Sequence, residues 1–517
     1  MRALRPLLWA QGAATAAAPV PAEAAARVLP GTLRPSPLRL YDRDQDADDL
    51  SVQGWGLVFA PDADVPALTA ALAPLIEARE REMGRSVWIT QLPADPEEAR
   101  RARERLLLSG PVRDEALPLH LLLIGGPKQL SWELQASLSG TFRVGRLPFD
   151  EASLLRLYAE RAAAPPTGLR SAGFAVSHDG SAVTENAGEL LVEPLRRAAA
   201  RVLPVLPAQA PADLLGAPAG AIAFTLSHGL GPPDEGWTPA ERAARLGALV
   251  IDAQTRLAAT DLPSRVLPGG FWFLTACFGL GIAERGVFSH WLADLPWGDA
   301  AAIAAQSAQA AAGGPMVAAL PRAALASRDG PLAILGHVDI AWELAWTDDE
   351  TGSRPGAFLE ALRGLWEGRR AGSAAQAMHL ARMTYEYELA RETDLDRARP
   401  SPRSAEEEVL HREHLGKLWL RRNDLAGYLL LGDPAAHIGA APAAAVTRAA
   451  APLPAPDLSG APGVPPVPLD PLERAILAHL LGLGVGDDTL AALGLDTSAL
   501  AERAQRWLAG GRDALLG

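Results

Sequence analysis

The sequence contains almost no cysteine, and this scarcity excludes two kinds of protein. Cys277 is the only cysteine among 517 residues. One cysteine cannot form a disulfide within the chain, which fits a reducing compartment such as the cytoplasm. It also cannot supply the cysteine ligands of a structural zinc site, and we expect neither a metal nor a cofactor. A lone thiol can still serve as a nucleophile.

Long apolar runs are missing as well. No segment approaches the roughly 20 unbroken apolar residues that cross a bilayer. The first ten residues have some features of a signal peptide, but Gln11 and Gly12 interrupt the apolar stretch and an alanine-rich segment follows. We therefore predict a cytoplasmic protein that has no membrane partner.

Lysine is the third scarce residue, with Lys128 and Lys417 as the only two. Nearly all basic side chains are arginines, and acidic residues exceed basic ones, which leaves a net charge of −13. An acidic chain is poorly suited to bind nucleic acid as its main partner. The hydrophobic content of 49% with 21% charged residues is typical of a globular protein.

Apolar runs alternate with segments of helical periodicity through most of the chain. We predict strands at 54–60, 117–126, 143–146, 173–177, 221–226, 271–277, 331–336 and 428–434. We predict helices at 65–82, 150–164, 186–202, 239–260, 356–368 and 371–392. This alternation is typical of an α/β fold with a mostly parallel sheet and helices on both faces.

Composition changes along the chain suggest five parts. Residues 1–40 are rich in Ala and Pro, and we expect them to be loosely ordered or draped on the surface. A smaller α/β subdomain at 41–166 precedes a larger α/β domain at 167–440. A Pro/Ala linker at 441–468 leads to a short helical module at 469–517, which could bind a protein partner or cap the main body.

Two of the predicted strands end in residues that can carry chemistry. The run 221–226 leads into His228, and the run 271–276 ends at Cys277; glycines follow at Gly229 and Gly279. Neighbouring parallel strands that end in a His and a Cys can place an imidazole beside a thiol, as thiolate catalysis requires. The structural alternative is a small buried thiol and an unrelated structural histidine.

The motifs around these residues resemble the caspase-type (clan CD) cysteine peptidases, the group that includes gingipains and bacterial CHAT proteins. The resemblance is carried by Ser-His-Gly at 227–229, Thr-Ala-Cys-Phe-Gly at 275–279, Leu-Leu-Gly-Asp-Pro at 430–434 and Leu-Leu-Leu-Ile-Gly-Gly-Pro at 121–127. The His and the Cys are separated by 49 in residue number, close to the roughly 50 noted for caspases. The fit is closest to CHAT-like proteins of bacterial defence loci, including those found beside bacterial gasdermins.

The resemblance implies a three-layer α-β-α caspase-like domain that hydrolyses peptide bonds through a Cys/His dyad. Cys277 would be the nucleophile and His228 the general acid and base. The backbone N–H groups of Gly229 and Cys277 would bind the oxyanion. The resemblance implies a protein substrate, such as a gasdermin-like effector in antiviral defence or regulated cell death.

Three residues are candidates for substrate binding. Asp252 could select Arg or Lys by a charge-assisted pair, although it could equally be a solvent-facing acid on a helix. Asp339 and Trp342 follow the strand predicted at 331–336 and could line the same cleft, whereas Trp342 could also be a core residue. We interpret His337 as structural, and His178-Asp179 as a turn.

Two other functions are compatible with the sequence. A non-catalytic adaptor would keep the fold and bind partners through its C-terminal helices; it predicts an unreactive, buried Cys277. A different thiol enzyme, such as an acyltransferase or amidase, predicts a compact small-molecule pocket. The peptidase hypothesis requires His228 and Cys277 to meet at one rim of the sheet, and a thiol walled off from solvent would count against it.

Overall fold

The computed structural model describes residues 7–10, 15–16, 21 and most of 46–439, together with 490, 495, 499–500 and 503. The gaps within 46–439 are 94, 96–97, 99–100, 103–116, 167, 169, 208–209, 234, 296–297, 348–351 and 399–402. The chain divides into two compact units, Met1–Ala443 and Ala444–Gly517. The linker predicted at 441–468 and almost all of the module predicted at 469–517 lie outside the described residues.

The first sheet of the larger unit contains four parallel strands in the order β4-β3-β5-β6. These are β3 (Trp55–Phe59), β4 (Trp88–Gln91), β5 (His120–Ile124) and β6 (Arg143–Leu147). Every residue of β3, β5 and β6 is buried, which explains why β3 and β5 are nearly continuous apolar runs; β6 also buries the charged side chains of Arg143 and Arg146.

Four helices accompany this sheet. They are α1 (Leu50–Gln53), α2 (Val65–Met83), α4 (Trp132–Leu138) and α5 (Ala152–Ala163). Helix α2 begins where the Asp64 carboxylate accepts a hydrogen bond from the N–H of Ala67, and it ends at Gly84 in the left-handed conformation. The helices predicted at 65–82 and 150–164 are therefore confirmed.

The second sheet has the order β16-β15-β12-β8-β7, with only β16 antiparallel. Its strands are β7 (Ser171–Val176), β8 (Ala221–Leu226), β12 (Phe271–Thr275), β15 (Ala333–His337) and β16 (Tyr428–Gly432). The mixed α/β fold with a mostly parallel central sheet, predicted from the sequence, is thus confirmed.

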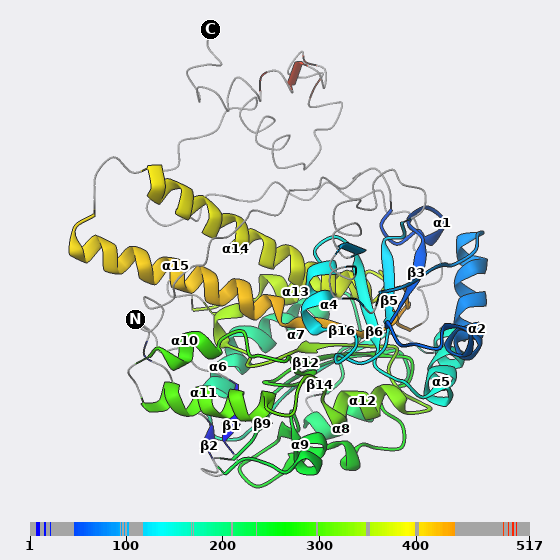
Figure 1. Ribbon diagram of the computed structural model, residues 1–517, viewed down its shortest axis with the longest axis horizontal. Coiled ribbons are helices and arrows are strands. Elements are labelled where there is room, and N and C mark those ends of the chain that lie inside the picture. Colours follow the sequence, from blue (N-terminus) through cyan, green and yellow to red (C-terminus); the bar gives the residue numbers. More distant parts are fainter. Residues whose placement is uncertain are drawn as a thin grey trace. The chain divides into compact units, whose positions relative to one another are not determined.

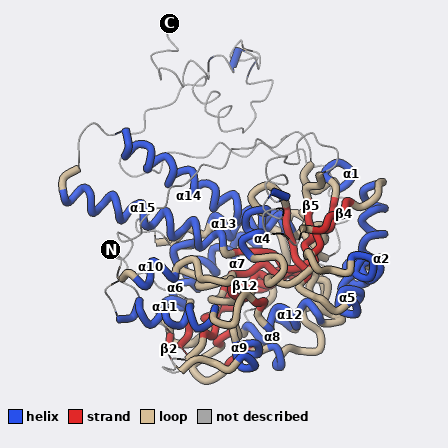
Figure 2. Tube along the Cα trace, viewed as in Figure 1, coloured by secondary structure: helices blue, strands red, loops and turns tan. Residues whose placement is uncertain are grey.

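The two faces of this sheet bury different side chains. Phe271 and Phe273 of β12 belong to one buried cluster, whereas Trp272 and Leu274 belong to another, as alternation along a strand requires. Figure 2 shows α13 to α15 on one side of β12 and α8, α9 and α12 on the other. The helices around the sheet are α6 (Ala182–Ala187), the π-turn Gly188–Val192, α7 (Glu193–Ala199), α8 (Pro211–Leu215), α9 (Pro239–Arg245), α10 (Ser289–Ala293), α11 (Gly298–Ala311), α12 (Ala319–Ala326), α13 (Gly356–Trp366), α14 (Gly372–Ala398) and α15 (Ala405–Ala426).

Two long helices contain most of the described residues in the charged region 397–413. Helix α14 extends to Ala398, and α15 starts after Ser404, whose side chain and that of Glu407 form a reciprocal cap. In Figure 1 the two long helices lie side by side. The acidic first turn of α15 is solvent-exposed at Glu406.

A third sheet is built from short strands, and two sequence predictions prove wrong in it. Its order is β11-β10-β9-β1-β2, formed by β1 (Leu8–Ala10), β2 (Thr15–Ala16), β9 (His228–Gly231), β10 (Leu249–Val250) and β11 (Arg256–Leu257). A two-stranded sheet, β13 (Gly281–Ile282) with β14 (Met316–Val317), lies apart from it in the topology.

The first correction concerns residues 239–260, predicted as one helix. The helix stops at Arg245, because Leu246 has a non-helical ψ of 127° and Gly247 follows with a positive φ of 73°; β10 and β11 then form a hairpin. The second concerns residues 1–40, predicted to be loosely ordered or on the surface. Residues 8–10 instead form β1, and the Leu7 side chain is fully buried.

A buried ionic cluster joins the first sheet's helix α2 to the end of β16. The Asp433 carboxylate accepts hydrogen bonds from Arg79 Nε at 3.0 Å, Arg79 Nη2 at 2.6 Å and Trp55 Nε1 at 2.9 Å. Close by, Gly145 of β6 lies so near β16 that a Cβ on it would be 2.0 Å from the Gly432 carbonyl oxygen. Charge pairing and close backbone approach therefore hold the two sheets together.

Asp433→Ala is predicted to destabilise the larger unit by about 3 kcal/mol, because the buried Arg79 guanidinium loses one of its two carboxylate partners and keeps only the half-buried Glu82. Asp329→Ala is the matched control, since the ion pair of Asp329 with Arg265 is exposed and should be worth about 0–1 kcal/mol. Urea unfolding of both variants measures these losses. Equal losses would contradict the structural role assigned to Asp433.

Candidate functional site

His228 and Cys277 follow neighbouring strands at the same level of the sheet. Leu226 at the end of β8 pairs with Thr275 at the end of β12, and the Ser227 N–H donates to the Thr275 carbonyl at 3.1 Å. Two residues further along each chain come the histidine and the cysteine. The structure therefore places the two residues predicted as a dyad on neighbouring loops whose main chains are in contact; their action as a dyad stays a prediction.

The backbones of the two loops touch at Gly229. A Cβ placed on Gly229 would lie 1.7 Å from the carbonyl oxygen of Cys277 and 3.0 Å from its nitrogen. No side chain fits in that space, so the glycine after His228 is a steric requirement of bringing the two loops together.

The imidazole of His228 faces the loop that follows β7. Its Nε2 lies 3.0 Å from Ser181 Oγ and 3.8 Å from Asp179 Oδ2. Asp179 is oriented by its other oxygen, which accepts from the Ser181 N–H at 2.9 Å and the Thr184 hydroxyl at 2.8 Å. Among the described residues Asp179 Oδ2 has no hydrogen bond, so this carboxylate is aimed at the imidazole.

The turn expected at His178-Asp179 is present, since the Asp179 side chain accepts from the Ser181 N–H two residues on; the approach of its second oxygen to His228 was not expected from the sequence. The signal was available: this dipeptide follows a predicted strand, and β7 proves to be the direct neighbour of β8. Carboxylates that follow one parallel strand reach the side chain that follows the next. A carboxylate behind the imidazole orients the ring and stabilises its charged form.

The thiol of Cys277 is enclosed. Its Sγ accepts from the Ala341 N–H at 3.4 Å and lies 3.7 Å from the Ala341 carbonyl oxygen, and the side chain is 0% exposed. Burial raises the pKa of the thiol well above its ordinary value, and the carboxylates of Asp424 and Asp339 add to the increase. The thiol is therefore neutral in this state, and it is walled off from solvent.

Leu7 closes the site. Its carbonyl oxygen accepts from the Gly229 N–H at 2.9 Å, and its own N–H donates to the Ala341 carbonyl at 2.9 Å. Burial has the largest effect on both pKa values, raising that of Cys277 and lowering that of His228. Hydrogen bonding to the Leu7 backbone shifts each pKa in the opposite direction. The Leu7 main chain thus lies beside both members of the dyad.

Backbone strain is concentrated next to the thiol. Phe278 and Asp339 are non-glycine residues with positive φ, 54° and 81°, and the Phe278 N–H donates to the Asp339 carbonyl at 2.7 Å. Such conformations cost free energy and persist where the surrounding structure enforces them, often at functional sites.

The predicted substrate residues Asp339 and Trp342 are deeply buried. The Asp339 carboxylate accepts from the N–H groups of Val287 at 2.7 Å and Ile340 at 2.9 Å, and burial raises its pKa. The Trp342 ring packs edge-on against neighbouring aromatic rings. Both residues are enclosed in the core, which agrees with the core alternative left open for Trp342, and their role in substrate binding stays a prediction.

Asp252 lies in the hairpin turn after β10, rather than on the predicted helix. Its Oδ1 accepts from the N–H groups of Gln254 and Thr255, each at 2.8 Å, and these hydrogen bonds lower its pKa. Since Val250 pairs with His228, the turn is at the margin of the site. Selection of basic residues by Asp252 stays a prediction.

His337 has partners at both ring nitrogens. Nδ1 lies 3.1 Å from the Asp339 carbonyl, and Nε2 lies 3.0 Å from the Asp424 carbonyl. Burial, the largest single influence, opposes protonation of this ring, but the interactions with Asp424 and Asp339 together outweigh it and raise the pKa. These contacts agree with the structural role expected for His337.

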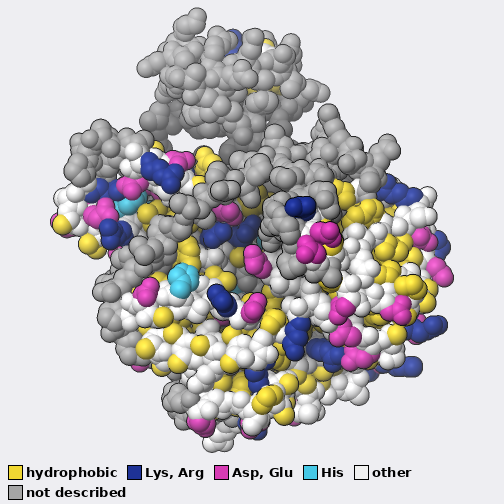
Figure 3. Space-filling view, in the orientation of Figure 1, with side chains coloured by type: hydrophobic (Ala, Val, Ile, Leu, Met, Phe, Trp, Pro, Cys, Tyr) yellow, Lys and Arg dark blue, Asp and Glu magenta, His cyan; other side chains and the backbone are white. Residues whose placement is uncertain are grey.

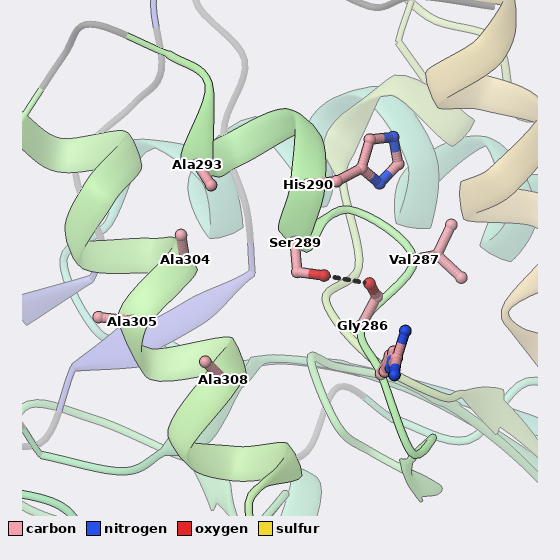
Figure 4. A pocket seen from close by; sticks show the side chains of 9 residues that line it. Gly286, Val287, Ser289, His290, Ala293, Ala304, Ala305 and Ala308 are labelled. Atoms are coloured by element: carbon pink, nitrogen blue, oxygen red, sulfur yellow. Dashed lines mark hydrogen bonds between the residues drawn. The ribbon is translucent and has the colours of Figure 1, made fainter. Parts of the chain in front are cut away.

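An open hollow of about 760 Å³ lies near the strained loop. It is lined by Arg285, Gly286, Val287, Ser289, His290 and four alanines; Figure 4 shows Ala304 and Ala308 of α11 facing Ser289 of α10 across it. The loop at Val287 is the one held by Asp339. Neither His228 nor Cys277 lines this hollow.

Acidic and basic side chains are interspersed on the face drawn in Figure 3, without a large field of one sign. Within the described part of the chain no helix has the length and apolarity to cross a membrane. The same residues contain no cluster of three or more His, Cys, Asp or Glu arranged to hold a metal ion.

Comparisons with protein-family models, curated proteins and solved structures found no match to the chain.

The pH dependence of stability should report on His228. Burial lowers its pKa to about 4, with Asp179 opposing the shift. The unfolded chain, with an ordinary pKa of about 6.5, takes up the proton first, so stability is complete above pH ~6.5 and falls as pH drops toward 4.

Between pH 7 and pH 5 this group should cost the wild-type chain roughly 2 kcal/mol that a His228→Gln chain does not lose. Urea unfolding at the two pH values measures the difference. His290→Gln, at an exposed position, is the control and should follow the wild type. Identical losses in all three proteins would contradict a buried neutral imidazole at position 228.

Proposed function

We propose that the chain is a caspase-like cysteine peptidase, a thiol hydrolase that cleaves a protein partner and is captured here in a closed state. The observation that carries the proposal is the matched position of His228 and Cys277 after neighbouring parallel strands. The carboxylate of Asp179 behind the imidazole extends the pair to a Cys-His-Asp arrangement. The three-layer caspase-like architecture and the cytoplasmic location belong to the same proposal.

The chemistry assigns one step to each group. His228 takes the proton of the Cys277 thiol, and the sulfur attacks the carbonyl carbon of the peptide to form a tetrahedral adduct. The Gly229 N–H, which is already directed at a peptide carbonyl at 2.9 Å, stabilises the oxyanion. His228 then protonates the departing amine, and water releases the acyl group from the sulfur.

The closed state also supports a second candidate. A buried thiol with a raised pKa is what a non-catalytic adaptor of this fold predicts. The difference lies in what covers the thiol. The cover includes the main chain of Leu7, bound to the Gly229 N–H proposed for the oxyanion, and an adaptor has no need of a donor in that position.

Hydrolysis of labelled casein tests the proposal, measured both in the wild-type chain and in a Leu7→Asp chain designed to open the site. Cys277→Ala should reduce turnover by several orders of magnitude. Asp179→Asn should reduce kcat on the order of 10²- to 10⁴-fold, because the imidazole loses its orienting carboxylate.

Glu185→Gln, an acid on α6 just beyond this loop, is the matched control and should leave kcat unchanged. Turnover that survives Cys277→Ala would contradict the mechanism. An absence of turnover in every folded variant, the opened chain included, would favour the adaptor.

A further inference from the structure

The N-terminal strand is bound to the site as an extended peptide. Strand β1 runs parallel to β9 and pairs Leu8 with Gly229, Trp9 with Leu230 and Ala10 with Gly231. In Figure 1 the blue β1 lies beside the green β9. Strand addition of this kind uses main-chain hydrogen bonds, which do not depend on the side chains of the added peptide.

Leu7 is the residue of this peptide that meets the dyad. Its carbonyl oxygen accepts a hydrogen bond from the Gly229 N–H, and its own N–H donates to the Ala341 carbonyl, both at 2.9 Å. Ala341 is also the residue whose N–H contacts Cys277 Sγ. A substrate residue whose carbonyl is about to be attacked needs the same two anchors: a donor at its oxygen, and a fixed backbone beside the sulfur.

The side chain of Leu7 indicates what this position accepts. It is 0% exposed and belongs to the same buried apolar cluster as Cys277, Phe278 and Trp342. An enclosed apolar space favours an aliphatic side chain and opposes a charged one, because an unpaired charge there would lose its hydration.

We propose that Leu7 occupies the subsite for the substrate residue on the acyl side of the scissile bond. Two consequences follow, and both rest on the proposed peptidase function. Strand β1 is an internal competitor that must leave before a substrate binds. Substrates are extended peptides with leucine or a similar aliphatic residue before the cleaved bond.

This assignment differs from selection of Arg or Lys by Asp252. The Asp252 carboxylate is engaged by two amides of its own turn, whereas the side chain of Leu7 is enclosed in the buried apolar cluster that also includes Cys277. The preference of the enzyme at this subsite therefore separates the two hypotheses.

The rate at which iodoacetamide alkylates Cys277, followed by intact-protein mass spectrometry, tests whether Leu7 occupies the site. This measurement does not rely on proteolysis. Leu7→Asp should accelerate alkylation on the order of 100-fold or more, since a buried carboxylate expels the strand. Leu7→Met keeps an apolar anchor and should react as slowly as the wild type. Leu380→Asp places the same charge at an exposed leucine of α14 and should also remain slow.

Equal alkylation rates in folded Leu7→Asp and wild-type chains would show that Leu7 does not occupy the subsite beside Cys277. The casein assay would still test the proposed peptidase function separately. If circular dichroism shows that Leu7→Asp does not fold, Leu7→Gly replaces it with the same expected order of rates. An intact-mass product that begins at Leu8 would support the assignment, because it reports cleavage after Leu7.

The opened chain then reports the substrate class. Peptides that differ only at the acyl-side residue should be cleaved at least about 10-fold more efficiently with Leu than with Arg or Asp, and Cys277→Ala should abolish the cleavage. Equal or better cleavage after Arg would overturn the aliphatic subsite. Rapid alkylation without cleavage of any peptide would overturn the proposed function, and would leave Leu7 only as the residue that masks the thiol.

Discussion

The contact between Gly229 and the backbone of Cys277 is the constraint on which the rest of the site depends. Parallel pairing of β8 with β12 brings the two loops to the same level, and the missing side chain at Gly229 lets them touch. The donor N–H of Gly229 then points at a peptide carbonyl, and the strained residues Phe278 and Asp339 hold the thiol loop from the other side. The geometry is therefore built from main chain, which varies little when surface residues change.

The same geometry explains how a candidate active site can be fully buried. A peptidase cleft is lined with main-chain donors and acceptors, and any extended segment of its own chain can satisfy them. Leu7 does so here, at the cost of removing the thiol and imidazole from water. Burial then raises the pKa of Cys277 and lowers that of His228 to about 4, so neither group carries charge at neutral pH. Under the proposed function, exclusion of water would keep the pair inactive, and return of water to an opened cleft would restore the pKa values that catalysis needs.

Local sequence patterns predicted the buried strands and the positions of His228 and Cys277, because an apolar run bounded by glycine reports burial directly. These local patterns gave wrong or missing predictions where the structure depends on pairing between strands that are far apart in the sequence. The helix expected at 239–260 gives way to a hairpin because Leu249 and Val250 pair with β9. Asp179 and Leu7 reach the site only through the strand order, and the apolar start of the chain looked like part of a loose segment. Hydrophobic periodicity carries no information about which strands become neighbours.

Cleavage-site mapping on a library of peptides from a digested proteome tests the central claim most directly. The chain opened at Leu7 is incubated with the library, and new amino termini are identified by mass spectrometry beside a Cys277→Ala control. A latent peptidase with an aliphatic subsite predicts termini that are preceded mainly by leucine and that vanish in the control. A folded, opened chain with a reactive thiol that creates no Cys277-dependent termini would contradict the account.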